Sequence, residues 1–148
     1  MNAIVNKISV GYFLIFDKLN LLQPLALLAA RIYVAWVFFS SGLTKIRDWE
    51  TTLFLFEEEY SVPLLNFELD AWLSTVGELV LPVLLLLGIF GRFSALGLTV
   101  INIVAVLSLD VIAPAAFTLH LVWGVLLLQV VVWGSGYISA DNWLKAKS

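Results

Sequence analysis

Four long runs of apolar residues dominate the chain. They cover about residues 24–44, 70–91, 93–110 and 114–135. Three of the runs contain a single internal ionisable residue, which is Arg31, Glu78 or His120, respectively. A helix needs about 20 mostly apolar residues to cross ~30 Å of hydrocarbon. The pattern therefore predicts an all-α integral membrane four-helix bundle, with residues 1–148 forming one transmembrane domain.

Two amphipathic segments lie outside these runs. In residues 1–20, apolar side chains recur at helical spacing at Val5, Ile8, Tyr12, Ile15 and Leu19. In the loop 45–69, a similar stripe consists of Trp49, Leu53 and Phe56. A helix with one apolar face and one polar face suits the membrane–water boundary. We therefore expect an interfacial helix at each place, and we expect the N-terminal one to be retained in the mature protein.

The amino-acid composition limits which metal sites, cofactors and partners this chain can have. The chain is 61 % apolar, 13 % charged and free of cysteine, which excludes disulfides, thiolate metal sites and iron–sulfur clusters within it. Its single histidine cannot build a conventional zinc site or a bis-histidine haem. A net charge of −3 without a basic stripe argues against nucleic acid as a partner. We predict no metal site and no intrinsic cofactor, so any electron chemistry must come from elsewhere.

The basic residues indicate an orientation. Five of them fall on one side of the predicted spans: Lys7, Lys18, Arg92, Lys145 and Lys147. Lys45 and Arg47 fall on the other side. Because cytoplasmic loops carry the excess of Lys and Arg, we predict cytoplasmic N- and C-termini and an external loop 45–69.

That external loop is acidic. It contains the triplet Glu57, Glu58 and Glu59 at the end of the predicted amphipathic helix. A solvated helix end is the simpler interpretation, and docking of a partner or collection of cations is the other.

Polar residues of different spans reach a similar depth. At 1.5 Å per residue, Glu78 and Asn102 lie ~12 Å below the outer end and His120 lies ~9 Å below it. Span one contributes Ser41 and Lys45 at the outer end, and Trp123 lies one helical turn from His120. The partner of Glu78 is predicted to be Lys45, His120 or both.

Two interpretations of this layer stay open. One is interhelical polar contact, worth about 0.6 to 2 kcal/mol each. The other is a pocket that opens to the outer face, where Glu78 and His120 handle protons. In that pocket Lys45, Asn102, Ser41 and Trp123 would bind a quinone.

Arg31 lies deeper, ~10 Å from the cytoplasmic end of span one. We include it among the candidate ligand-binding residues. The preferred expectation, however, is that its side chain snorkels toward the cytoplasmic headgroups.

The order of several motifs resembles the DoxX family of small four-helix bacterial membrane proteins. The motifs are Arg31, "SSGLTKI" at 40–46, "EEYSVPLL" at 58–65, "GELVLPVLLLLGIFGRFSALGL" at 77–98 and "GSGYISADNWL" at 134–144. The resemblance implies the bacterial cytoplasmic membrane and partners in membrane-bound oxidoreductase assemblies, as in thiosulfate:quinone oxidoreductase. The stretches "LFEEEYSVPLL" and "LHLVWG" are also similar to DoxX-like proteins that accompany copper-binding, ribosomally made peptides.

Two functions follow as expectations. The first is an accessory subunit of a quinone-linked oxidoreductase system. The second is a non-catalytic membrane scaffold or maturation partner for a metal-binding peptide or redox protein, docking through the outer loop. Four spans bury little internal surface, so self-association is compatible with either function.

Overall fold

The computed structural model describes residues 3–60, 66–109 and 111–147. These ranges contain helices joined by short loops and no strands. The helices are α1 (Ala3–Leu19), the short 3-10 helix η1 (Asn20–Leu22), α2 (Gln23–Arg47), α3 (Trp49–Glu58), α4 (Phe67–Leu87), α5 (Gly91–Leu107), α6 (Pro114–Trp133) and α7 (Ala140–Lys145). The prediction of an all-α protein is confirmed.

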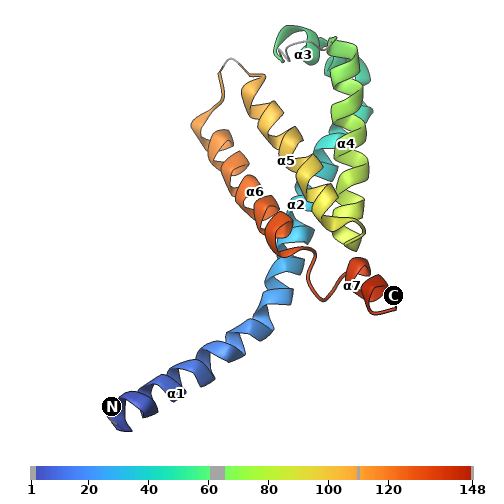
Figure 1. Cartoon of the computed structure of the whole chain (residues 1–148). Coiled ribbons are helices and arrows are strands. Elements are labelled where there is room, and N and C mark those ends of the chain that lie inside the picture. The colour runs from blue at the N-terminus through green and yellow to red at the C-terminus, as the bar shows by residue number, and fades with distance from the viewer. Residues whose placement is uncertain (1–2, 61–65, 110, 148) are drawn as a thin grey trace.

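Helices α2, α4, α5 and α6 form the bundle (Figure 1). α2 packs against α4, α4 against α5, and α5 against α6, while α6 also contacts α2. The buried core cluster consists of Val34, Phe38, Leu85, Ala95, Leu98, Leu127 and Val130. Buried polar side chains lie on both sides of this core along the helices. Arg31 lies toward the α7 end, and Glu78 and Asn102 lie toward the α3 end.

The surface of the bundle is apolar. Large side chains such as Trp36 and Val125 are more than three-fifths exposed, as suits helices that face lipid rather than water. By length and composition, three helical stretches of the described chain can cross a membrane: Ser9–Arg47, Phe67–Leu87 and Pro114–Trp133. α5 is a shorter apolar helix. Several long apolar helices thus build a membrane bundle.

The turn between α4 and α5 begins earlier than the sequence indicated. The second run was predicted to stay helical to Gly91, but α4 ends at Leu87 because Gly88 adopts a left-handed conformation with φ of 68°. Phe90 follows with φ of 49°, and α5 begins at Gly91. Glycine takes this conformation at no steric cost, which explains the helix end at this position.

The two amphipathic segments are helical but differ in their contacts. α1 extends away from the bundle (Figure 1), and the side chains of Tyr12 and Leu19 are about half exposed. α3 packs on α4, with Thr52 and Phe56 buried. The side chains of Val5, Ile8 and Ile15 lie outside the described part, as do residues 61–65 of the motif "EEYSVPLL" and residue 110 at the end of the third predicted span.

Candidate functional site

Glu78 is buried at the α3 end of the bundle and forms an ion pair with Lys45. The Lys45 Nζ lies 2.5 Å from Glu78 Oε2, and only 6 % of the Glu78 side chain is exposed. Lys45 Nζ also donates to Ser41 Oγ at 3.3 Å. Gly42 allows this approach of α2 to α4, because a Cβ there would lie 3.2 Å from the carbonyl carbon of Glu78. Of the partners predicted for Glu78, Lys45 is the one that contacts it.

His120 pairs with Asn102 instead. The Asn102 amide nitrogen donates to the backbone carbonyl of His120 at 3.0 Å, and Asn102 Oδ1 lies 2.8 Å from His120 Nδ1. An amide oxygen can only accept, so in this arrangement Nδ1 carries the proton. A neutral imidazole then keeps the lone pair of Nε2 as an acceptor. Asn102 therefore fixes both the ring and its tautomer.

A cavity of about 410 Å³ joins these two polar pairs. Five predicted residues line it: Ser41, Lys45, Glu78, His120 and Trp123. Asn102 hydrogen-bonds to His120 but does not line the cavity itself. The His120 and Trp123 rings meet edge to face at 4.8 Å. The rest of the wall is largely apolar and includes Phe38, Phe56, Leu73, Val100, Ile101 and Val104. The structure thus brings the predicted polar layer together around one cavity, which we call the outer cavity.

Two ionisable lining residues, Asp70 and Tyr60, were not singled out from the sequence as site residues. Asp70 lies eight residues before Glu78, a spacing that returns to nearly the same face of a helix and could have revealed it. Tyr60 had no such signal, because its place depends on a backbone bridge to Leu109 from the loop after α5. Burial raises the pKa of the Tyr60 hydroxyl, with smaller contributions from the negative charges of Glu59 and Glu78. The outer cavity therefore carries more acidic groups than the sequence suggested.

Arg31 does not snorkel, and that expectation is wrong. Its side chain is buried with 1 % exposure, and it donates to four backbone carbonyls. These are Leu85 at 2.8 Å, Leu86 at 2.5 Å, Ser135 at 2.7 Å and Ile138 at 2.7 Å. The first two acceptors lie in the last turn of α4, where the Leu85 carbonyl also accepts from the Gly88 N–H at 3.1 Å. The last two belong to the tail after α6. The assignment of Arg31 to a ligand site does not fit, because most of its donors already bind the backbone.

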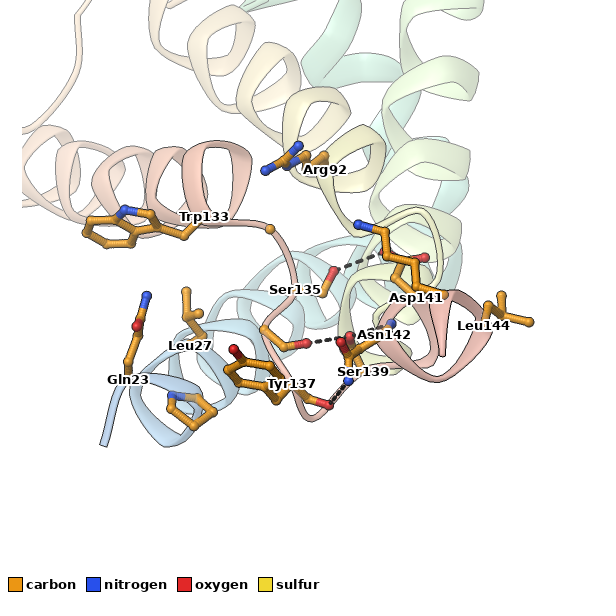
Figure 2. Close-up of a pocket in the computed structure, with 14 residues that line it drawn as sticks. Gln23, Leu27, Arg92, Trp133, Ser135, Tyr137, Ser139, Asp141, Asn142 and Leu144 are labelled. Carbon is orange, nitrogen blue, oxygen red and sulfur yellow. Dashed lines mark hydrogen bonds between the residues drawn. The ribbon is translucent and has the colours of Figure 1, made fainter. Parts of the chain in front are cut away.

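The tail motif completes this arrangement. Asp141 accepts hydrogen bonds from the backbone N–H groups of Phe90 and Gly91, each at 2.9 Å, and so caps the start of α5. Ser135 Oγ donates to the same carboxylate at 3.2 Å, an interaction drawn in Figure 2. The serine-x-aspartate step at Ser139 and Asp141 therefore ties the C-terminal tail to the turn between α4 and α5. Ser139 and Asp141 of the family motif therefore have a structural role.

The acidic triplet lies at the end of α3. The side chains of Glu57, Glu58 and Glu59 are all exposed. Within the described ranges, no three His, Cys, Asp or Glu side chains are grouped closely enough to hold a metal ion. The triplet thus offers negative charge to the solution rather than a preformed metal site.

Comparisons with known proteins agree on a family. The sequence profile of the DoxX family matches residues 26–111. An uncharacterized protein of Haemophilus influenzae is 32 % identical over 129 residues, covering 81 % of this chain and 83 % of its own length. No solved structure matches the chain. The profile match includes α2, α4 and α5, and thus Lys45, Glu78 and Asn102.

Proposed function

The chain belongs to the DoxX family of membrane proteins, and on that premise we propose that it is an accessory subunit of a quinone-linked membrane oxidoreductase system. The outer cavity is the quinone site in this proposal. We also propose that the protein resides in the bacterial cytoplasmic membrane, with both termini in the cytoplasm and the outer cavity at the external face.

The composition of the cavity wall supports a quinone as the ligand. A volume of about 410 Å³ lies within the usual range for small-molecule pockets. Its apolar side chains, with Trp123 at one edge, suit a flat ring, and a few polar groups converge on it. The main observation in support of the proposal is that polar side chains pair with each other at the cavity. Lys45–Glu78 and Asn102–His120 place a donor and an acceptor around one apolar space.

Each polar residue has a distinct role. Lys45 has donors beyond its bond to Glu78 and can donate to a carbonyl oxygen, while the Glu78 carboxylate stabilises the ammonium group. His120, held by Asn102, offers Nε2 to take up a proton from the aqueous side and to donate it to the quinone oxygen. A bound quinone would supply the redox chemistry, taking up two electrons and two protons to give a quinol. Since the chain has no cysteine and we predict no redox group in it, a partner dehydrogenase must deliver the electrons.

Direct binding tests the proposal. The purified full chain in detergent would be titrated with a short-chain ubiquinone, with quenching of tryptophan fluorescence as the readout. We expect saturable quenching, and we expect His120→Leu to weaken binding at least tenfold, the loss of one good polar contact. Thr118→Val is the matched control, because Thr118 is exposed on the same helix and bonds only to the Pro114 carbonyl. Absence of saturable binding by the wild-type chain would refute the proposal.

A second function is supported by the acidic triplet. α3 is anchored by buried Thr52 and Phe56, so the exposed Glu57, Glu58 and Glu59 are held at a defined place on the bundle. In this alternative the protein is a scaffold or maturation partner that docks a basic redox protein or a metal-binding peptide there. Replacement of all three by Gln would abolish recovery of the partner, while Glu78→Gln would leave it unchanged. The quinone function predicts the reverse pattern for ubiquinone binding.

A further inference from the structure

A second cavity, of about 510 Å³, lies at the opposite end of the bundle. Its wall is built where α6 ends and α2 begins, together with the tail and α7 (Figure 2). We call it the tail cavity. Because two spanning helices end at this level, the cavity lies at the depth of lipid headgroups rather than of acyl chains.

The tail cavity carries positive charge. Arg92 and Lys145 both line it, and both side chains are exposed. Arg92 donates from Nη2 to the Val132 carbonyl at 3.2 Å, which leaves most of its five N–H donors for another acceptor. Gly134 packs against the guanidinium, where a Cβ would lie 3.6 Å from Arg92 Nε. The Arg92 side chain is thus held at the cavity with donors to spare.

Asp141 also lines the tail cavity, but its carboxylate is already hydrogen-bonded to the backbone. Both carboxylate oxygens accept backbone hydrogen bonds, from Phe90 and from Gly91. Two cations therefore face the cavity against one carboxylate that is already stabilised at the start of a helix. An anion is the ligand that this balance favours.

Aromatic and apolar side chains form the rim. Trp133 is 57 % exposed and Tyr137 is 78 % exposed, and Figure 2 shows both beside Gln23 and Leu27. Trp and Tyr side chains of this kind concentrate at the membrane–water boundary. An anion with an attached acyl chain satisfies both the cations and this rim, whereas a free anion satisfies only the cations.

We propose that the tail cavity binds the phosphodiester headgroup of an anionic phospholipid, with Arg92 as its main contact and Lys145 as a second. Basic pockets at the ends of spanning helices bind such headgroups. The site is separate from the outer cavity, and it does not depend on the quinone function.

Native mass spectrometry tests this inference. The full chain in a neutral detergent would be mixed with dioleoyl phosphatidylglycerol or, separately, with dioleoyl phosphatidylcholine. We expect the wild type to retain phosphatidylglycerol at least fivefold better, about the factor that one cation contributes near an anionic headgroup. Arg92→Gln should remove this preference and Arg92→Lys should restore much of it. Arg47→Gln, an exposed arginine at the other end of α2, is the matched control and should change nothing.

Each other outcome counts against the inference. Equal retention of the two lipids by the wild type would overturn it, and so would a preference that survives both Arg92→Gln and Lys145→Gln. If Arg92→Gln does not fold, Lys145→Gln still tests the inference, because it removes the second proposed contact. Complete competition by millimolar inorganic phosphate would show a free-anion site instead of a lipid site.

Discussion

The two ends of the bundle use buried charge in opposite ways. At the tail end, Arg31 donates to four backbone carbonyls and Asp141 accepts from two backbone N–H groups. At the α3 end, Lys45 pairs with Glu78 and His120 with Asn102, around a cavity. Charges bound to backbone join segments of the chain. Side chains that pair with each other retain donors and acceptors for a ligand.

This difference separates structural from functional roles. A charged group in hydrocarbon costs about 2.5 to 3.5 kcal/mol even on a lenient scale, so each one must be compensated. Arg31 is compensated by backbone carbonyls in the last turn of α4 and in the tail. Glu78 is compensated by a single ammonium group that itself lines the outer cavity. Changes to Arg31 or Asp141 should therefore reduce stability, whereas changes to the polar pairs at the α3 end should reduce binding.

The largest effect is expected for Arg31→Met. This change removes four hydrogen bonds and leaves buried carbonyls without donors. We expect a loss of about 3 to 5 kcal/mol in the free energy of unfolding, or no folded protein. Thermal unfolding in detergent measures it, with Arg47→Met as the exposed control. A folded variant within 1 kcal/mol of wild type, by the net value of one hydrogen bond, would contradict this role.

Gly88→Ala should have the next largest effect. Gly88 has φ of 68°, and a Cβ there would lie 2.5 Å from the Ser139 Cβ and 2.9 Å from Arg31 Nη2. Backbone strain and the clash together should cost about 1 to 3 kcal/mol. Gly11→Ala is the control, since its Cβ would meet nothing within 4 Å. Equal melting temperatures for the two variants would show that the turn does not need glycine.

Asn102→Leu should affect binding at the α3 end. Without the amide, the tautomer and orientation of His120 are no longer fixed. We expect ubiquinone affinity to fall about tenfold, which corresponds to ~1.4 kcal/mol. Fluorescence titration measures this change, with Thr118→Val as the control. Unchanged affinity would mean that the ring orientation of His120 does not matter for the ligand.

The smallest effect concerns acid pH at α3. Hydrogen bonds from the Thr51 side chain and then from its backbone N–H lower the pKa of Asp48 below its ordinary 3.8. A lowered pKa means that the cap stabilises α3 above about pH 3.8 and that this contribution is lost as pH falls through the folded-state pKa. The Thr51 amide resonance should therefore titrate with a midpoint below 3.8. A midpoint at or above that value would show that Asp48 does not cap α3.

The sequence was sufficient to predict the polar layer at the α3 end. Glu78, Asn102 and His120 are isolated polar residues in apolar helices, and depth follows directly from the rise per residue. The sequence was not sufficient to predict the hydrogen-bond partners of Arg31. The acceptors of Arg31 are backbone carbonyls in an irregular tail, and backbone groups have no sequence signature. The same reason explains why Tyr60, placed by a backbone bridge to Leu109, was missed.

Ubiquinone binding by Glu78→Gln, compared with Glu57→Gln, tests the central claim most directly. Both variants replace one glutamate by its neutral isostere, but only Glu78 is buried and paired with Lys45. The account predicts that Glu57→Gln binds as wild type does and that Glu78→Gln folds but loses most of its affinity. Lost folding of Glu78→Gln, or wild-type binding by a stable Glu78→Gln, would instead make the buried acid an interhelical contact without a ligand role.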